Sequence, residues 1–424
     1  MSRPSDVLRP FPRHPTEGVL IDCPQAHRWL ALLAWGEERD LYTYQQPLDG
    51  RSGPRVQVRG RPMLMLSAYD YLGLTGHPDI EDAAVAAVRA FGTGTGGVRM
   101  LTGTNRLHVE LEAELAAFKG VPAALSFASG YLANFAAVTA LVGPRDRVLI
   151  DAHAHRSLHE ACRLAQVPTR AFRHNDMDAL EKLLARPRRG GRALIIVDGL
   201  YSMDGDVSPL PDLVALKRRY DAFLLVDEAH ALGVLGQGGR GTHEAYGLAP
   251  DCVDVWTGSL SKAVPSNGGF VAGSRELIVY LQHAGAPFWF SAALCPPAAA
   301  AACAALRVAR REPERLDRQR CAARVLRDGL REHGYETGGS TAAIVPVIVG
   351  SAERAWRLAR ALFARGVIAA AIVHPAVPRR GARLRLCATA ALSEADLVEG
   401  IEAFAALAAV PLSLPEPAPA VGTM

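Results

Sequence analysis

Short apolar runs alternate with segments of helical periodicity between residues 123 and 283 of the chain. The apolar runs predict strands at 123–127, 147–150, 193–197, 223–226, 253–256 and 270–272. Apolar residues at helical spacing predict the intervening helices at 131–142, 157–164, 176–184, 210–220 and 275–283. This alternation is typical of a mostly parallel α/β sheet with helices on both faces.

The two ends of the chain carry a weaker pattern, which predicts further structural units. Before the alternating region, the pattern predicts helices at 24–40, 79–91 and 106–118 and strands at 55–59 and 63–67. After Pro296, an alanine-rich helical stretch reaches residue 333, followed by strands at 343–349, 367–373 and 383–387 and helices at 352–365 and 394–408. We predict an N-terminal arm and helix over 1–74, a large α/β domain over 75–300 and a smaller C-terminal α+β domain over 301–409. The first 20 residues are predicted to form a loose arm and residues 410–424 a disordered tail.

The composition fits an ordinary soluble enzyme and argues against several other classes. Of the 424 residues, 49% are hydrophobic and 21% are charged. The net charge of +4 is too small to indicate a nucleic-acid partner. No apolar run is long enough to span a membrane and no signal-peptide core is present, so we expect a cytoplasmic protein without a membrane partner. The seven cysteines are scattered and never spaced Cys-x-x-Cys, which argues against disulfides or a zinc site.

Polar clusters follow four of the predicted strands, at 129–131, 151–155, 227–230 and 257–262. The carboxyl ends of parallel strands meet at one edge of a sheet, and ligands bind there. The four clusters are therefore predicted to form one site. A glycine-rich stretch at 92–97 is a weaker signal, because it lacks a dinucleotide-binding fingerprint and a flexible connection explains it equally well.

Lys262 lies in the last cluster, within the run Thr-Gly-Ser-Leu-Ser-Lys-Ala-Val-Pro-Ser-Asn-Gly-Gly at 257–269. The chain has only four lysines, and Lys119, Lys182 and Lys217 are predicted on solvated helix faces. The small and hydroxyl-bearing neighbours of Lys262 let a ligand approach its amine. Such an amine can have a lowered pKa and form a Schiff base. A surface loop lysine is the alternative, and this motif alone does not decide between them.

Asp227 follows a fully apolar strand, where a carboxylate is costly to bury without a partner. A protonated ring nitrogen would be such a partner, and a helix N-cap is the alternative interpretation. The run Asp-Glu-Ala-His at 227–230 also matches the Mg²⁺-binding box of ATPases, but the chain has no Gly-Lys pair for the required phosphate loop. His153, His155 and His159 are not spaced to share one face, and we predict no metal site.

A phosphate site is indicated where Ser129, Gly130 and Tyr131 open a helix after a strand, because amides at a helix N-terminus bind phosphate. Ser259, three residues before Lys262, offers a further hydroxyl group. A Schiff-base lysine, a buried carboxylate for a ring nitrogen, an imidazole and a phosphate cradle are the demands of pyridoxal 5′-phosphate (PLP).

Ordered motifs extend this interpretation along the chain. They are Asp70-Tyr-Leu-Gly-Leu74, Arg99 with Gly103-Thr and His108-x-x-Leu-Glu, Ser129-Gly-Tyr-x-x-Asn134, Asp151-x-x-x-His155-x-Ser157, Tyr201-Ser-Met-Asp-Gly-Asp206, Val226-Asp-Glu-Ala-His230, Ser259-Leu-Ser-Lys262 with Gly268-Gly, Phe290-Ser291, and Pro375-Ala-Val-Pro with Arg383-Leu-Arg385. In these motifs the sequence resembles the α-oxoamine synthases, PLP-dependent acyltransferases of fold type I, over roughly residues 65–405.

The resemblance implies roles around the cofactor ring. Lys262 would form the Schiff base with PLP, and His155 would stack on the pyridine ring. Asp227 would pair with the ring nitrogen and keep it protonated. His230 and Ser202 would contact the phenolic oxygen of the ring.

The resemblance also implies how the phosphate and the substrates are held. The turn at Ser129, Gly130 and Tyr131 and the hydroxyl of Ser259 would bind the phosphate. Ser291 would reach the phosphate from a neighbouring subunit, which implies a homodimer. Arg385 would bind the carboxylate of the amino-acid substrate, because a planar guanidinium suits that group.

A few positions depart from the family's pattern. Tyr69 occupies a position that faces the substrates and is usually Asn. Ser259 replaces a threonine, and Ala292 removes a hydroxyl group after Ser291. Pro265 stands in the run after the lysine, where glycine is common. These departures bear on the substrates more than on the cofactor.

The implied reaction joins a small amino acid to an acyl thioester, from CoA or an acyl-carrier protein, with loss of CO₂. The products are an α-aminoketone and a free thiol. An aminotransferase of the same fold and a non-catalytic scaffold subunit are the alternatives. Lys262 argues against the scaffold, and the ordered motifs argue against the aminotransferase. The Pro/Arg-rich arm would suit an acidic carrier protein, although a disordered arm is the simpler interpretation.

Overall fold

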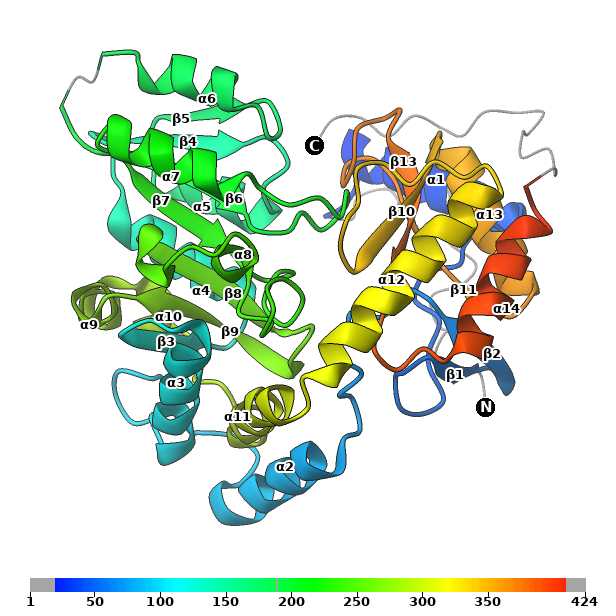
Figure 1. The fold of residues 1–424 in the computed structure, drawn as a ribbon, viewed down its shortest axis with the longest axis horizontal. Helices are drawn as coiled ribbons and strands as arrows, with labels where there is room; N and C mark the ends of the chain where they lie inside the picture. The colour runs from blue at the N-terminus through cyan, green and yellow to red at the C-terminus, as the bar shows by residue number, and fades with distance from the viewer. Residues whose placement is uncertain (1–19, 188–189, 409–424) are drawn as a thin grey trace. The chain divides into compact units, whose positions relative to one another are not determined.

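The structure, a computed structural model, describes residues 20–187 and 190–408 (Figure 1). The predicted tail and all but the last residue of the predicted arm lie outside these ranges. The chain divides into two compact units, Tyr69–Arg320 and a second one that joins Met1–Ala68 to Cys321–Met424. The domain boundaries predicted after residues 74 and 300 stay a prediction. None of the helices in the described ranges is long and apolar enough to cross a membrane.

The larger unit is built on a seven-stranded sheet with the strand order β3-β9-β8-β7-β6-β4-β5. Its strands are β3 (Ala123–Phe127), β4 (Arg147–Asp151), β5 (Thr169–Phe172), β6 (Ala193–Asp198), β7 (Phe223–Asp227), β8 (Val255–Ser261) and β9 (Pro265–Gly273). Strand β9 is antiparallel to β3 and β8, and the other neighbouring strands are parallel. The predicted mostly parallel sheet is confirmed.

Helices cover both faces of this sheet. They include α4 (Gly130–Leu141), α5 (Arg156–Leu164), α6 (Met177–Leu184), α7 (Leu210–Arg219) and α9 (Arg275–Ala284). Figure 1 shows α6 and α7 in front of the sheet and α4 and α5 behind it. Leu194 and Ile196 of β6 pack into one core cluster with residues of α4 and α5, and every residue of β6 is buried. Burial on both faces explains why the strands are continuous apolar runs rather than alternating ones.

The larger unit contains further helices outside the regular alternation of strands and helices. They are α2 (Pro78–Phe91), α3 (Arg106–Lys119), α8 (Thr242–Ala245), α10 (Ala286–Phe290) and α11 (Pro296–Arg311), with a 3₁₀ turn η2 at Pro250–Cys252. The alanine-rich stretch predicted as one helical region is divided into α11 and α12 (Glu314–Glu332) around Glu312 and Pro313. Proline lacks the backbone N–H that would continue α11.

Two features of the sheet differ from the sequence prediction. Strand β8 continues through Ser261, so the small and polar residues before Lys262 lie in a strand rather than in a loop. Lys262 therefore sits in the short connection between β8 and β9. Gly258 allows this pairing, because a Cβ there would lie 2.5 Å from the ring of Phe270. Strand β5 was not predicted, because it is short, only one of its four residues is buried, and it carries no apolar run.

The smaller unit contains two three-stranded sheets. One has the order β1-β2-β11 and the other β10-β13-β12. Their strands are β1 (Arg55–Val58), β2 (Arg61–Met65), β10 (Ile344–Gly350), β11 (Val367–Ile368), β12 (Ala370–Ile372) and β13 (Ala382–Cys387). The unit also contains helices α1 (Pro24–Glu38), α13 (Ala352–Ala364) and α14 (Glu394–Ala405) and the part of α12 from Cys321 onward. Trp35 of α1 packs against Trp356 of α13 with ring centroids 5.9 Å apart.

The prediction of a single strand at 367–373 is wrong. It is divided into β11, which pairs in parallel with β2, and β12, which pairs with β13. The apolar run continues across the division because both halves contribute to the core of this unit. An apolar pattern reports burial and does not show which neighbour a strand pairs with.

Candidate active site

The four polar clusters predicted to converge lie at the carboxyl ends of β3, β4, β7 and β8. These four strands run in the same direction, because β3 and β8 are both antiparallel to β9, and β4 to β8 are linked through parallel pairs. All four ends therefore face one edge of the sheet. Among the predicted site residues, only Arg385 lies outside this unit.

Asp227 ends β7 and is buried, with its two carboxylate oxygens held by different groups. Oδ1 accepts a hydrogen bond from the main-chain N–H of Ala229 at 2.8 Å, so Asp227 also caps the following turn. Oδ2 accepts a hydrogen bond from Asn134 Nδ2 at 2.7 Å. Burial with fixed donors is the arrangement that keeps a carboxylate in place for a cationic ring nitrogen.

Asn134 connects Asp227 to His155 through Ser157. Asn134 Nδ2 donates to Ser157 Oγ at 2.9 Å, and Ser157 Oγ lies 2.7 Å from His155 Nδ1. The main-chain N–H of Ser157 also donates to Nδ1, at 3.4 Å. Nδ1 thus serves as an acceptor, which places the proton of the neutral ring on Nε2. The orientation of the His155 ring is therefore coupled to the carboxylate of Asp227.

Asp198 lies beside Asp227, at the end of the neighbouring strand. The two residues are register partners in the β6–β7 pair, and both are buried. Burial, and then the charge of Asp227, raise the pKa of Asp198 well above its ordinary value. Asp198 Oδ1 accepts a hydrogen bond from the main-chain N–H of His155 at 3.0 Å. The raised pKa favours the neutral form of Asp198.

Lys262, His230, Tyr69 and Tyr71 form a second group at this edge. His230 is buried, and its Nδ1 lies 2.7 Å from the hydroxyl oxygen of Tyr71. The ring of Tyr69 meets the His230 ring edge to face, with centroids 5.8 Å apart. The Lys262 amine lies 6.0 Å from the centroid of the Tyr69 ring. The half-buried amine thus lies near an aromatic face.

The N-terminus of α4 forms a close-packed cradle. Ser129 is the N-cap residue, and its Oγ accepts a hydrogen bond from the main-chain N–H of Leu132 at 3.2 Å. A Cβ at Gly269 would lie 2.4 Å from Gly130 Cα, and a Cβ at Gly130 would lie 3.1 Å from Ser259 Cβ. Ser259 Oγ lies 2.8 Å from Ser261 Oγ. Glycines here let the β8–β9 hairpin approach the amides of the helix, as an anion site requires.

The other predicted residues occupy different settings. Ser202 is buried in the turn after β6. The side chain of Tyr131 is 43% exposed, and its hydroxyl group donates to Glu160, which leaves only its main chain for the predicted phosphate contact. Ser291 follows α10 and is half-buried. Arg385 lies on β13 of the smaller unit, where it is buried. Its predicted role stays a prediction.

Two predictions about the lysines are wrong. Lys119 does not lie on a solvated helix face, because its side chain is only 1% exposed and its Nζ lies 3.2 Å from Glu228 Oε2. The helical pattern placed Lys119 at the end of an amphipathic segment and did not show its partner Glu228, which follows β7. Lys217 does not lie on a solvated face either, because its side chain is only 15% exposed and its Nζ lies 2.8 Å from Asp254 Oδ2. Asn134 and Ser157 belong to the motifs noted in the sequence, but their connection of His155 to Asp227 was not predicted.

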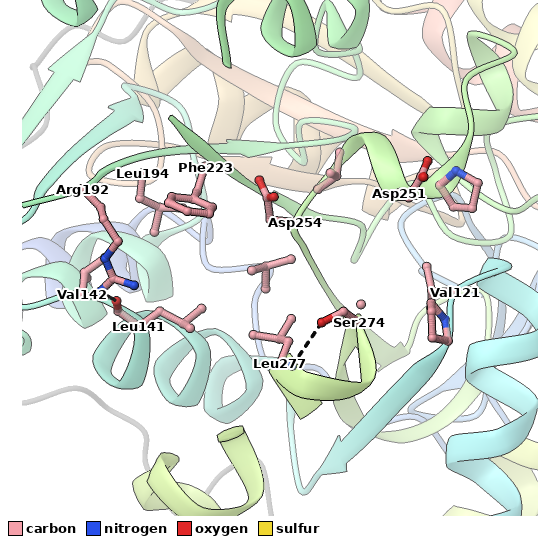
Figure 2. Close-up of a pocket in the computed structure, with 15 residues that line it drawn as sticks. Val121, Leu141, Val142, Arg192, Leu194, Phe223, Asp251, Asp254, Ser274 and Leu277 are labelled. Carbon is pink, nitrogen blue, oxygen red and sulfur yellow. Dashed lines mark hydrogen bonds between the residues drawn. The ribbon is translucent and has the colours of Figure 1, made fainter. Parts of the chain in front are cut away.

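A pocket at the opposite edge of the sheet does not contain these residues. It has a cavity volume of about 370 Å³ and is lined at the start of β6, β7 and β8 by residues such as Leu194, Phe223 and Val255. Figure 2 shows this pocket, with Leu194 and Phe223 labelled. Ligands of parallel sheets bind beyond the carboxyl ends of the strands, and this pocket lies at the amino ends. No group of three or more His, Cys, Asp or Glu side chains suited to a metal ion occurs in the described ranges.

Comparisons with known proteins define the family. The family model for aminotransferase class I and II matches residues 61–404. The chain is 44% identical over 370 residues to 8-amino-7-oxononanoate synthase from Geobacter sulfurreducens, covering 87% of this chain and 94% of that protein. It is 36% identical over 369 residues to serine palmitoyltransferase from Bacteriovorax stolpii, covering 87% and 88% of the two chains. A solved serine palmitoyltransferase from S. paucimobilis, with a bound PLP–myriocin aldimine, has a TM-score of 0.85 at 32% identity, covering 88% of this chain and 94% of that one.

The chain therefore belongs to the aminotransferase class I and II family, whose fold-type I architecture it shares. Within this family it is an α-oxoamine synthase, a PLP-dependent acyltransferase. The donor set at the sheet edge fits PLP. It offers an amine at Lys262, a buried carboxylate at Asp227, and helix amides beside glycines that leave room for a phosphate.

Proposed function

We propose that this protein condenses alanine with an acyl thioester, releasing CO₂ and a free thiol and forming an α-aminoketone. The observation that carries the proposal is the placement of Lys262, Asp227, His155 and His230 at one edge of one compact unit. This arrangement accompanies the 44% identity to an 8-amino-7-oxononanoate synthase.

The choice of alanine follows from the chemistry of that relative's product. An 8-amino-7-oxononanoate carries its amino group on a carbon that bears a methyl group, next to the keto carbon. Alanine that loses its carboxyl group supplies such a carbon. The rest of the product is a seven-carbon acyl group that ends in a carboxylate. We therefore propose a dicarboxylic acyl thioester as the second substrate, with serine and a long-chain acyl thioester as the second candidate pair because of the serine palmitoyltransferase relatives.

The chemistry of the reaction requires a proton to leave the α-carbon of the amino acid. PLP, when bound, supplies a carbonyl group that takes up the amino acid and a ring that accepts electrons. Lys262 is the proposed base, because its amine projects from the β8–β9 connection and has small neighbours on both sides. Asp227 is proposed to hold a proton on the ring nitrogen, and the Asn134 hydrogen bond keeps its Oδ2 in place.

The remaining predicted residues are proposed to hold the cofactor and the substrates. Ser129, Gly130, Tyr131 and Ser259 would hold the phosphate through the cradle at the start of α4. His155 would lie on the ring face, and His230 with Ser202 would contact the phenolic oxygen. Arg385 and Tyr69 stay the proposed substrate contacts. Tyr69 already lies within the group around Lys262.

We also propose a homodimer, with Ser291 donated to the site of a second copy. Apolar side chains support this surface, since Phe290 is 86% exposed and Leu101 is 71% exposed. Their segments are joined, because the main-chain N–H of Met100 donates to the carbonyl of Phe288 at 3.3 Å. Exposed apolar side chains of this size on two joined segments are typical of an interaction surface.

A substrate screen tests the proposed function. Glycine, alanine and serine are each combined with short, long and dicarboxylic acyl thioesters of CoA and of acyl-carrier protein, and thiol and CO₂ release are followed. We expect alanine with a dicarboxylic acyl thioester to give the highest kcat/KM. If thiol and CO₂ are released only from the combination of serine with a long-chain thioester, the second candidate substrate pair is favoured. Transfer of the amino group to a keto acid without thiol release would contradict the proposal.

A further inference from the structure

A histidine outside the predicted site joins two of its strand ends. His174 follows β5, and its Nδ1 lies 2.9 Å from Asp151 Oδ1 while its Nε2 lies 2.8 Å from Asp206 Oδ2. Asp151 ends β4, four residues before His155, and Asp206 closes the turn that carries Ser202. One imidazole ring therefore connects the segment that presents His155 to the turn that presents Ser202.

The contacts of His174 define its charge. An ionised carboxylate only accepts hydrogen bonds, so both ring nitrogens donate and the ring is an imidazolium. Burial acts to lower the pKa of His174, but the hydrogen bonds to Asp151 and Asp206 raise it to about 10. Burial likewise acts to raise the pKa of Asp151, and hydrogen bonds from His174, Asn175 and His153 lower it. The raised pKa of His174 and the lowered pKa of Asp151 both indicate that these two side chains are charged.

Asn175 also donates hydrogen bonds to the carboxylates of Asp151 and Asp206. Its main-chain N–H donates to Asp151 Oδ2 at 2.9 Å, and its Nδ2 donates to Asp206 Oδ2 at 3.0 Å. Asn175 adopts a φ of +51°, a left-handed conformation that asparagine tolerates better than most residues. This turn brings both its side chain and its main chain to the carboxylates, so the bridge is built from two adjacent residues.

Aromatic neighbours restrict the ring of His174 on its face and its edge. The ring of His153 stacks on it with centroids 4.1 Å apart and planes at 15°. The buried ring of Tyr201 meets it at 85°, with centroids 4.4 Å apart. His153 Nδ1 also lies 3.2 Å from Asp204 Oδ2, in the same turn as Ser202. The turn is thus attached to the end of β4 by two histidines and three carboxylates.

We propose that His174 is a positioning residue for the PLP site, where its imidazolium bridge sets the distance between the His155 segment and the Ser202 turn. This inference rests on the proposed placement of PLP at this edge of the sheet. His174 does not itself touch the reacting atoms. Without its charge, Asp151 and Asp206 lose the cation that both share, and the Ser202 turn is held to β4 only by the contacts of Asn175 and His153.

The test compares the holoenzyme of three proteins, the wild type, His174→Gln and Leu180→Ala. Glutamine keeps one donor near the carboxylates but carries no charge. Leu180→Ala is the matched control, because Leu180 is fully buried on the adjacent α6 and its truncation destabilises the unit without touching the bridge. We expect His174→Gln to raise the dissociation constant for PLP about 10- to 100-fold, as losing hydrogen bonds to a charged group implies. Leu180→Ala is expected to retain the wild-type value at a similar loss in melting temperature.

A second measurement reports on the bridge without the cofactor. In apoprotein labelled with ¹⁵N-histidine, at about pH 8 where an ordinary histidine is neutral, we expect a histidine protonated at both nitrogens whose signal disappears in His174→Gln. Should His174→Gln fail to fold, Asp206→Asn carries the same affinity test, with the same direction expected. A neutral His174 at that pH, or equal PLP affinities in His174→Gln and Leu180→Ala, would overturn the proposal. A charged His174 with no PLP binding in the wild type would instead contradict the proposed function.

Discussion

The amine of Lys119 lies 3.2 Å from the carboxylate of Glu228, and both side chains are buried. Lys119 also donates to the carbonyl of Arg240 at 2.9 Å, and its Nζ lies 3.6 Å from the centroid of the Trp256 ring. Glu228 directly follows Asp227, the proposed partner of the cofactor nitrogen. The ion pair thus anchors the turn after β7 to the end of α3. The ion pair is a structural contact that lies next to the proposed cofactor site.

Replacing Lys119 by methionine is expected to destabilise the protein by about 3–5 kcal/mol, because it leaves the Glu228 charge buried without its partner. The free energy of unfolding is measured by urea denaturation, with Lys182→Met on the exposed face of α6 as the control. The double variant with Glu228→Gln should recover part of the loss, since neither charge is then left alone. A Lys119→Met protein as stable as the Lys182→Met protein would show that the pair contributes nothing.

The acid limb of the stability profile is expected to depend on His243. Its Nδ1 lies 3.0 Å from the Lys119 amine, and burial, then the charge of Lys119, lower the pKa of His243 to about 3. Below its ordinary pKa of about 6.5, the unfolded histidine binds a proton that the folded one does not. Stability should therefore fall as the pH drops from about 6.5 towards about 3.

Denaturation at several pH values checks this expectation. His243→Gln should have a shallower decline over that range than the wild type, whereas His333→Gln, at an exposed position of the smaller unit, should follow the wild type. Parallel curves for the wild type and His243→Gln would contradict the assignment.

Asn134→Ala is expected to weaken PLP binding about 10- to 100-fold, because Asp227 loses the donor on its Oδ2 and Ser157 loses its link to that carboxylate. Equilibrium dialysis of the cofactor gives the affinity. The control is Thr139→Ala on the same helix, where the Thr139 hydroxyl group donates to the carbonyl of Phe135 at 2.7 Å. Equal affinities for both variants would remove Asn134 from the cofactor site.

Lys262→Ala is expected to slow exchange of the α-hydrogen of the amino acid with solvent deuterium by about 10²- to 10⁴-fold, the contribution of a positioned general base. Nuclear magnetic resonance of alanine in D₂O follows the exchange. The visible absorption of covalently held PLP should be lost in the same variant. Exchange at the wild-type rate would mean that another group is the base.

Phe290→Asp is expected to shift the protein from dimer to monomer, because a charge placed in an apolar interface is costly to desolvate. Sedimentation velocity gives the assembly state, and Val398→Asp, at an exposed position on α14 of the other unit, is the control. A stable dimer in the Phe290→Asp protein would place the interface elsewhere. A wild-type monomer with full activity would contradict the dimer proposal itself.

The sequence by itself determined every strand of the larger unit's sheet except β5, and the residues at the strand ends. Apolar runs with helical segments between them have few stable arrangements, and parallel strands bring their carboxyl ends together whatever their partners are. Lys262 and Asp227 could be found in this way, because Asp227 directly follows an apolar run and Lys262 lies in the polar cluster after the next one. The chemistry proposed for Lys262 and Asp227 depends only on their residue types and on their position at that edge of the sheet.

Only the tertiary structure decided which side chains meet. Lys119 resembles an exposed helix residue until α3 is placed against the turn that carries Glu228. His174 and Asn175 follow a strand too short and too exposed to be predicted, yet they join Asp151 to Asp206. The physical reason is that a pattern along the chain reports burial, which is a property of a segment. A hydrogen bond or an ion pair depends on two segments whose separation in space is defined only by the packed fold.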